Sequence, residues 1–291
     1  MLDTIVARRE KHGGHGIVVS TSIRPLIAPL FVPGDRPERF AKAAASGADA
    51  VILDLEDAVA AERKAYAREC IRSHGLDGSR TIIRVNARTS PWFEADLAAL
   101  REIPIAALML PKVEHAGDIA AIQAALQRTV SVIPLIESAA GLAGLTDILG
   151  APGVCMAALG SIDYALDLGC AHAWEPLLPA RAELVLRSRL AGLAAPLDGV
   201  TTAIDDPVAV AHDARRAADL GFGGKLAIHP RQIAPISHAF RPDEAAVSWA
   251  QRVIATADTG AARSLDGEMI DRPVMERARR ILARAAKPGA C

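Results

Sequence analysis

Acidic side chains follow two apolar runs of the sequence, at points where a buried strand would emerge from the core. Glu137 closes the run SVIPLI, and Asp163 follows the run VCMAALGSI. Carboxylate oxygens suit Mg²⁺, which usually takes one or two of them while water and substrate fill its other positions. Either acid taken alone is more simply explained by a helix cap or a surface ion pair. Because both acids end strands that would be adjacent, we predict that Glu137 and Asp163 together bind Mg²⁺.

Other polar side chains stand at the ends of similar runs. They are Asp54, Glu56 and Asp57 after one run, Arg84 and Asn86 after the next, Lys112 after a third and His229 after the last. In a barrel of parallel strands the chemistry lies at the carboxyl ends of the strands, so these side chains are candidates for one active site. Ser138 and Ser161 stand beside the two acids, but no paired His is evident, and we interpret both as turn or cap residues.

The elements that must position these residues alternate along the chain. Short apolar runs begin at Pro25, Asp49, Arg80, Ala107, Ser131, Val154, Leu197 and Phe222. Amphipathic stretches of roughly ten to fifteen residues separate them, which is typical of parallel strands joined by crossover helices. Eight such units predict an α/β fold of the (β/α)₈ TIM-barrel type, which needs about 250 residues. A doubly wound open sheet is the alternative, but no GxGxxG motif follows the first run.

Three segments are predicted along the chain. Residues 1–23 are expected to form a flexible leader, because the segment is rich in glycine. Residues 24–240 are expected to form the barrel, in which Asp206 caps a helix that begins at Pro207. Residues 241–291 add two helices and a turn that a barrel does not require. We therefore predict that the last segment is a C-terminal helical extension that serves as a lid.

Composition and charge exclude several classes of protein. The 291 residues are 51% hydrophobic and 23% charged, as in an ordinary globular protein. With 33 basic and 34 acidic residues the formal net charge is -1, so no excess field attracts nucleic acid or an anionic membrane. The four cysteines form no CxxC pair, which favours a reducing compartment. No apolar stretch near the amino terminus is long enough for a signal peptide or a membrane span, and we predict a cytoplasmic protein.

Motifs in a fixed order resemble those of a known family. They are LFVPGDRPERFAKA, ADAVILDLEDAV, RVN, MLPKVE, PLIES, LGSIDYALDLG, GFGGKLAIHPRQI and DGEMIDRP. Together they resemble the citrate lyase β subunit-like family of the HpcH/HpaI aldolase superfamily, which includes malyl-CoA and citramalyl-CoA lyases. The resemblance runs from about Arg24 to the last helix. It implies a Mg²⁺-dependent barrel enzyme, a trimer or a hexamer, that makes or breaks a carbon–carbon bond between a CoA thioester and a small oxo acid.

The resemblance also implies roles for single residues. The metal pair of the family falls on Glu137 and Asp163, and its substrate arginine falls on Arg84, whose planar guanidinium suits a carboxylate or an enolate oxygen. An ion pair with Asp54 or Glu56 across the barrel mouth is the structural alternative for Arg84. We expect Asp54 and Glu56 to orient Arg84 and to hold water on the cation.

Further residues are implied at the CoA-binding end of the site. Arg36, Arg39 and Lys42 fall on the segment that holds the CoA phosphates, with a solvated helix face as the alternative. His229 and Pro230 fall near the thioester, although a single strand-end His is often only hydrogen-bonded to a neighbour. Asp271 falls on the catalytic aspartate of the carboxyl-terminal lid, which in the family acts on a neighbouring subunit. Without the resemblance, Asp271 would be interpreted as the N-cap of a helix that begins before Pro273.

These expectations define one reaction and its alternatives. The leading hypothesis is reversible Claisen-type cleavage of a 3-hydroxyacyl-CoA of the malyl-CoA or citramalyl-CoA type into acetyl-CoA and a 2-oxo acid, with Mg²⁺ polarising the reacting oxygens. Arg84 would stabilise the enolate, and Asp271 would protonate it. The alternatives are a citrate lyase β subunit that acts on a carrier-bound citryl group, and a metal-dependent pyruvate aldolase, which needs neither a CoA site nor Asp271.

Overall fold

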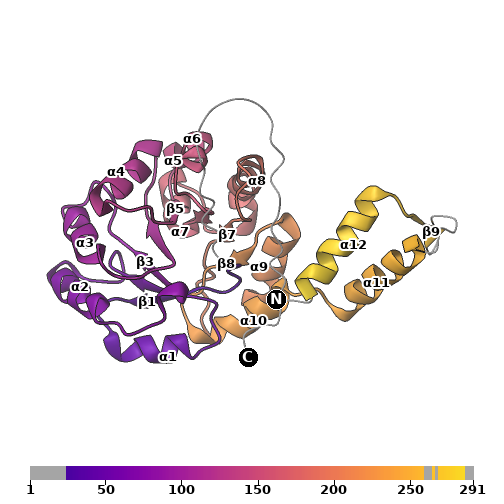
Figure 1. Ribbon diagram of the computed structural model, residues 1–291, viewed down its shortest axis with the longest axis horizontal. Coiled ribbons are helices and arrows are strands. Elements are labelled where there is room, and N and C mark those ends of the chain that lie inside the picture. The colour runs from indigo at the N-terminus through magenta and orange to yellow at the C-terminus, as the bar shows by residue number, and fades with distance from the viewer. Residues whose placement is uncertain (1–23, 259–263, 266–267, 286–291) are drawn as a thin grey trace.

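A closed ring of strands surrounded by helices forms the main body of the molecule, and a pair of helices projects from its side (Figure 1). The structure is a computed structural model that describes residues 24–258, 264–265 and 268–285. The predicted leader, residues 1–23, lies outside the described residues. The division between a barrel at 24–240 and an extension at 241–291 remains a prediction.

Eight parallel strands form one sheet in the order in which they occur along the chain. They are β1 (Leu30–Pro33), β2 (Val51–Asp54), β3 (Thr81–Arg84), β4 (Ala107–Leu110), β5 (Val132–Ile136), β6 (Ala158–Leu159), β7 (Leu197–Asp198) and β8 (Gly224–Lys225). The residues after β8 close the ring on β1. The Phe31 N–H donates to the Ala227 carbonyl at 2.8 Å, and the Ala227 N–H donates to the Pro29 carbonyl at 2.9 Å. The predicted TIM barrel is therefore confirmed, with all eight expected strands present.

Helices follow the strands and cover the outside of the ring (Figure 1). They are α1 (Phe40–Ala44), α2 (Lys64–Arg72), α3 (Phe93–Leu100), α4 (Ala116–Leu126), α5 (Ala139–Ala143), α6 (Leu145–Gly150), α7 (Ser161–Leu168), α8 (Trp174–Leu190), α9 (Pro207–Leu220) and α10 (Ile233–Phe240). Short 3₁₀ turns are η1 (Pro37–Arg39), η2 (Ala61–Arg63), η3 (Gly78–Arg80) and η4 (Pro230–Gln232). The expected cap of α9 is present, because Asp206 accepts hydrogen bonds from the amides of Val208 and Ala209 at 3.1 and 2.9 Å.

The strands are buried on both faces. One apolar cluster inside the ring contains Ile52, Ile82, Met109, Ile133 and Leu226, and a larger one lies between the strands and the helices. Burial on both faces explains why the strands appear in the sequence as continuous apolar runs rather than as alternating patterns. Polar residues are left for the ends of the strands, which is where the candidate site lies.

The carboxyl-terminal segment forms an arm that we define as α11 (Glu244–Asp258), β9 (Ser264–Leu265), β10 (Glu268–Met269) and α12 (Arg272–Ala285). Its two helices pack against each other and project away from the barrel (Figure 1). Ala250, Val253, Ile270 and Ala278 form a small apolar core within the arm. The two helices expected in this segment are thus present, and the arm has packing of its own.

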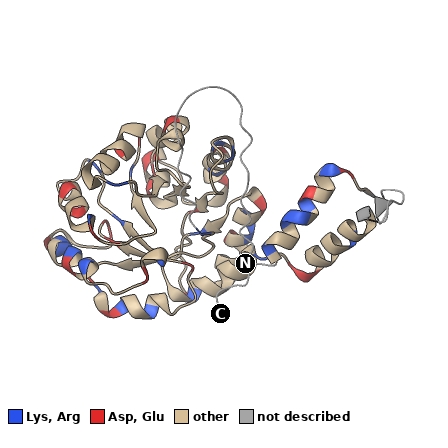
Figure 2. Ribbon diagram, viewed as in Figure 1, with Lys and Arg blue, Asp and Glu red and all other residues tan. Residues whose placement is uncertain are grey.

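Charged residues of both signs are distributed over the surface helices (Figure 2). This distribution agrees with the nearly balanced formal charge of the chain. Among the helices of the described residues, none is long and apolar enough to cross a membrane.

Candidate active site

A cavity of about 280 Å³ lies at the carboxyl ends of the strands. Its lining is Phe31, Asp54, Asp57, Ala58, Arg84, Leu135, Glu137, Leu159, Gly160, Ser161, Ile162, Asp163, Val200, Leu226 and Ile228. The fold thus brings together Asp54, Arg84, Glu137 and Asp163, which the sequence placed on four different strand ends. Four of the lining residues are acidic and one, Arg84, is basic. The cavity therefore carries an excess of negative charge that favours a cation.

Arg84, the last residue of β3, is fixed by carboxylates on two sides. Its Nε and Nη2 donate to the two oxygens of Asp54, each at 2.7 Å. Its Nη1 lies 2.9 Å from Glu56 Oε2, and the guanidinium stands over the ring of Phe31 at 4.7 Å. Burial alone would lower the pKa of Arg84, but the neighbouring carboxylates outweigh it and raise the pKa. The guanidinium stays charged in a defined orientation, and the ion pair considered as an alternative for Arg84 is present.

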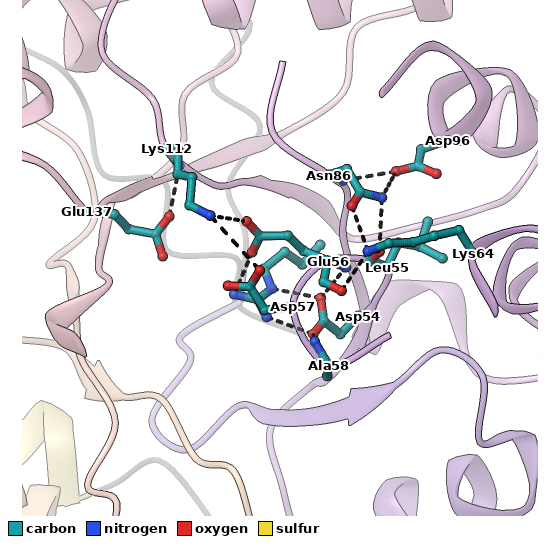
Figure 3. A network of polar contacts seen from close by, with 11 residues as sticks. Asp54, Leu55, Glu56, Asp57, Ala58, Lys64, Asn86, Asp96, Lys112 and Glu137 are labelled. Carbon is teal, nitrogen blue, oxygen red and sulfur yellow. Dashed lines mark hydrogen bonds and ion pairs between the residues drawn. The ribbon is translucent and has the colours of Figure 1, made fainter. Parts of the chain in front are cut away.

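The turn after β2 holds Asp54 and Glu56 in place (Figure 3). Asp54 accepts hydrogen bonds from the amides of Glu56 and Ala58 at 2.8 and 3.2 Å. Lys64, buried at the start of α2, donates to the carbonyls of Leu55 and Glu56 at 2.7 and 2.8 Å. A buried ammonium that binds two carbonyls of one turn fixes the backbone of that turn, and through it the two carboxylates.

Lys112 joins two carboxylates of the site (Figure 3). Its backbone N–H donates to Glu137 Oε2 at 2.9 Å, while its Nζ lies 3.1 Å from Glu56 Oε1. Lys112 has φ 53°, a left-handed conformation that few residues other than glycine adopt. This unusual backbone directs the N–H of Lys112 toward Glu137. The backbone of Lys112 thus binds one acid, Glu137, and its side chain binds another, Glu56.

Glu137 is buried at the end of β5, with its carboxylate close to other acids. Burial, the charge of Glu56 and the charge of Asp163 raise the pKa of Glu137 to about 8, against the lowering effect of Arg84. A Cβ atom at Gly160 would overlap the Glu137 side chain, so only glycine leaves room for it at the end of β6. Asp163, half-buried in the first turn of α7, lines the same cavity.

The donor set fits a hard divalent cation. Burial first, and neighbouring acids second, raise the pKa of Glu137, and a positive charge placed beside such a carboxyl group favours its charged form. Glu137 and Asp163 offer oxygen atoms at one cavity, and Mg²⁺ takes one or two carboxylates with water and substrate completing its shell. No group of three or more His, Cys, Asp or Glu residues suited to a metal occurs in the described part of the chain. Two carboxylates that leave the other positions to water and substrate are a donor set that fits Mg²⁺.

None of the five residues expected at the CoA-binding end is among those that line the cavity. Arg36 and Arg39 belong to the exposed turn around η1, and Lys42 is exposed on α1. All three follow β1, but none lines the cavity. His229 is the N-cap of η4, where its Nδ1 accepts from the Arg231 amide at 3.2 Å, and Pro230 is the first residue of that turn.

Asp271 caps α12 in the arm. Its Oδ1 accepts from the Val274 amide at 3.0 Å, and its side chain is exposed. The cap considered as an alternative is thus present. Asp271 and Met269 are both exposed, and Asp271 is not among the residues that line the cavity of its own chain.

The two serines beside the acids differ from each other. Ser138 caps α5 by accepting from the Gly141 amide at 3.0 Å, which confirms its interpretation as a cap. The corresponding interpretation of Ser161 is wrong, because the N-cap of α7 is Gly160. The Ser161 hydroxyl instead lies 3.0 Å from Nε2 of His172, a partner that was not evident in the sequence.

Several residues of the site could not be identified from the sequence. Phe31 under Arg84 and Lys64 behind the β2 turn belong to runs that indicated only a strand and a helix. Lys112 was noticed as a strand-end residue, but nothing in the sequence marks its left-handed backbone. A charged residue directly after a buried strand, as in the sequence MLPKV, is the one signal that pointed to it.

Comparison with known proteins gives consistent matches over most of the chain. The family model described as HpcH/HpaI aldolase/citrate lyase matches residues 28–230. The citrate lyase subunit beta-like protein of Deinococcus radiodurans is 36% identical over an alignment of 275 residues, and the match covers 88% of this chain and 96% of that protein. The L-malyl-CoA/beta-methylmalyl-CoA lyase of Cereibacter sphaeroides is 35% identical over an alignment of 276 residues, and the match covers 82% of this chain and 86% of that protein.

A solved structure extends the likeness to three dimensions. It is the crystal structure of protein CitE from Mycobacterium tuberculosis in complex with magnesium, acetoacetate and coenzyme A. The two chains share 35% identity with a TM-score of 0.83, and the match covers 90% of this chain and 99% of the other.

Proposed function

This chain belongs to the HpcH/HpaI aldolase/citrate lyase family and is an oxo-acid lyase of the citrate lyase β-like kind; from this premise we propose that it is Mg²⁺-dependent and acts on a 3-hydroxyacyl-CoA of the malyl-CoA or citramalyl-CoA type. The reaction cleaves the substrate to acetyl-CoA and a 2-oxo acid, or forms it by Claisen condensation. The observation that carries the proposal is the carboxylate pair Glu137 and Asp163 at one cavity with Arg84. The names of the Cereibacter lyase and of the Mycobacterium complex agree with this substrate class.

Glu137 and Asp163 hold Mg²⁺ in the proposal. When bound, Mg²⁺ supplies a Lewis acid that polarises the oxygens of the 2-oxo acid portion. The pKa of Glu137, raised by burial and by the charges of Glu56 and Asp163, supports this role, because a cation beside the carboxyl group favours its charged form.

Arg84 stabilises the acetyl-CoA enolate that leaves when the carbon–carbon bond breaks. Its guanidinium is already oriented by Asp54, Glu56 and the ring of Phe31, so little reorganisation accompanies the reaction. Three of its five N–H donors are directed at these carboxylates, which leaves donors for an enolate or a carboxylate oxygen. Asp54 and Glu56 act through Arg84 and through water at the cation.

Asp271 exchanges the proton of the acetyl-CoA methyl group, and it reaches the barrel mouth of a neighbouring subunit in a homotrimer or hexamer. The projection of the arm away from its own barrel supports an action on a neighbour. The exposure of Asp271 leaves its carboxylate accessible to such a partner. In the cleavage direction Asp271 is a general acid, and in the condensation direction it is a general base.

The CoA moiety lies over the segment after β1 in this proposal. Arg36, Arg39 and Lys42 are exposed cations that bind its phosphates, and His229 and Pro230 stand near the thioester. Exposed basic side chains on a short turn and helix support this placement, since phosphate groups are bound by such cations.

The decisive experiment supplies purified protein with Mg²⁺ and a panel of thioesters and oxo acids. We expect malyl-CoA or citramalyl-CoA to yield acetyl-CoA and a 2-oxo acid, and the reaction to stop when a chelator removes the metal. Cleavage of a carrier-bound citryl group alone would favour the citrate lyase β-subunit alternative. Condensation of free pyruvate with an aldehyde, without any effect of CoA, would favour the aldolase alternative.

A further inference from the structure

A serine and a histidine meet at the wall of the candidate site. Ser161 Oγ lies 3.0 Å from His172 Nε2. Ser161 is the first residue of α7, and His172 lies in the loop between α7 and α8. A hydroxyl and an imidazole within hydrogen-bond reach form a pair that can transfer a proton.

The serine end of the pair belongs to the cavity. Ser161 lines it together with Glu137 and Asp163, although the residue is only 1% exposed. A Cβ atom at Gly199, directly after β7, would overlap the Ser161 hydroxyl. The absence of a side chain at Gly199 therefore leaves the space that the Ser161 hydroxyl occupies.

The histidine end of the pair reaches solvent. His172 is an exposed residue, so its ring can exchange a proton with water. Partial burial lowers the pKa of His172, as do the positive charges of Arg181 on α8 and Lys225 on β8, against the opposing effects of Asp213 on α9 and Asp198 on β7. A neutral imidazole accepts a proton, so the pair connects the cavity to solvent in the protonation state that a base requires.

We propose that Ser161 and His172 form a relay that removes the hydroxyl proton of the 3-hydroxyacyl-CoA, an assignment that rests on the proposed lyase function. The substrate O–H proton passes to Ser161 Oγ while the Ser161 proton passes to His172 Nε2. The electron pair of the O–H bond forms the new carbonyl, and the carbon–carbon bond breaks. Its electron pair goes to the acetyl-CoA enolate, which takes a proton from Asp271 of the neighbouring subunit. His172 then releases its proton to solvent, and Asp271 regains one.

The relay divides proton transfer between two places. The hydroxyl proton leaves through Ser161 and His172, whereas the methyl proton is exchanged by Asp271. Removal of the relay should therefore block bond cleavage without blocking exchange of the acetyl-CoA methyl protons with deuterated solvent. A role of His172 in packing alone would impair both reactions together.

The test compares His172→Gln with the wild type, because glutamine can still accept a hydrogen bond from Ser161 but cannot take up its proton. We expect cleavage to fall by about 100-fold or more, the range of general acid–base catalysis, while methyl-proton exchange stays within about threefold. Ser161→Ala should give the same division, and it should shift the NMR signal of the His172 imidazole in metal-free protein. His238→Gln, an exposed histidine on α10, is the matched control and should leave both reactions unchanged.

Three results would overturn the relay. They are cleavage by His172→Gln within threefold of the wild type, parallel losses of cleavage and exchange, and an acyl ester trapped on Ser161, which would make that residue a nucleophile. A wild-type protein that cleaves no thioester of the panel overturns the proposed function and the relay with it. An active wild type with an unaffected His172→Gln overturns the relay alone.

Discussion

The barrel mouth and the arm differ in how their charged residues are held. At the mouth, Arg84 is bound by two carboxylates and an aromatic ring, and each of these partners comes from the same chain. In the arm, Asp271 is exposed and hydrogen-bonds to its own helix. The arginine and the carboxylates at the mouth thus hold one another, whereas Asp271 in the arm makes its hydrogen bond within its own helix. This difference bears on the proposed mechanism, because folding of one chain orients Arg84, whereas the role proposed for Asp271 requires assembly with a neighbouring subunit.

The largest expected effect concerns the metal pair proposed at the barrel mouth. Asp163→Asn should lower turnover by at least about 100-fold, because a neutral amide is a weaker ligand for Mg²⁺ than a carboxylate. The fold should remain intact, since Asp163 is half-buried at a helix start. Steady-state kinetics and circular dichroism measure the two quantities. Wild-type turnover by this variant without added metal would show that Asp163 is no ligand.

The next effect tests the arm. Asp271→Asn should lower exchange of acetyl-CoA methyl protons by about 100-fold or more while Mg²⁺ and CoA binding persist. Asparagine caps a helix about as well as aspartate, so the stability of α12 should change little. Proton exchange followed by NMR separates the two roles, since a residue that only caps would leave exchange at the wild-type rate.

Co-expression then asks whether the arm acts on its own chain or on a neighbour. Mixed oligomers of Asp271→Asn and Glu137→Gln chains should regain part of the activity, because some sites combine a wild-type metal pair with a wild-type arm from next door. Activity that stays absent in co-purified mixed oligomers would indicate that the arm completes the site of its own chain.

The pH dependence of metal binding gives a smaller, graded effect. Glu137 has a pKa raised to about 8, so protons compete with Mg²⁺ below that pH. Affinity for Mg²⁺ should rise by up to about tenfold per pH unit between pH 6 and 8 and then level off. Titration calorimetry in this range measures it, and a pH-independent affinity would remove Glu137 from the ligand set.

The same shift has the opposite sign for the metal-free protein. A carboxyl group whose folded pKa lies above its unfolded value of about 4.5 stabilises the fold fully below that value, and the contribution is lost as the pH rises toward 8. Glu137→Gln should flatten this part of the stability curve, which denaturant unfolding at several pH values measures.

The smallest effect concerns the exposed cations after β1. CoA at about 100 times its dissociation constant should stabilise the protein by about 2.7 kcal/mol, a thermal shift of about 5 °C. Replacing Arg36 and Lys42 together by alanine should reduce this shift. The arm variant Arg272→Ala, which removes an exposed cation paired with Glu276, is a matched control. An equal shift in both variants would place the CoA phosphates elsewhere.

The sequence predicted the parts of the site that depend on strand ends. Glu137 and Arg84 each follow an apolar run, and parallel strands bring such residues to one rim of the barrel irrespective of the conformation of the loops. Contacts that depend on the conformation of loops could not be predicted from the sequence. The left-handed backbone of Lys112 leaves no trace in residue type, and Ser161 meets His172 only because the chain turns back after α7. Strand lengths were also overestimated at β6 to β8, where each hydrogen-bonded strand spans two residues.

The closure of the ring between β1 and the residues after β8 sets an order of events during synthesis. Leu30 of β1 pairs with Ala227, so β1 gains its partner on this side only after nearly two hundred further residues have been synthesised. Such a distant pairing is slow to form because a long loop must close first. The arm follows in the chain and folds from contacts between near neighbours, notably α11 with α12. A pause in translation after α10 would therefore allow the barrel to be completed before the arm is synthesised. The length of a nascent chain would then determine whether it contains the barrel alone or the barrel with the arm.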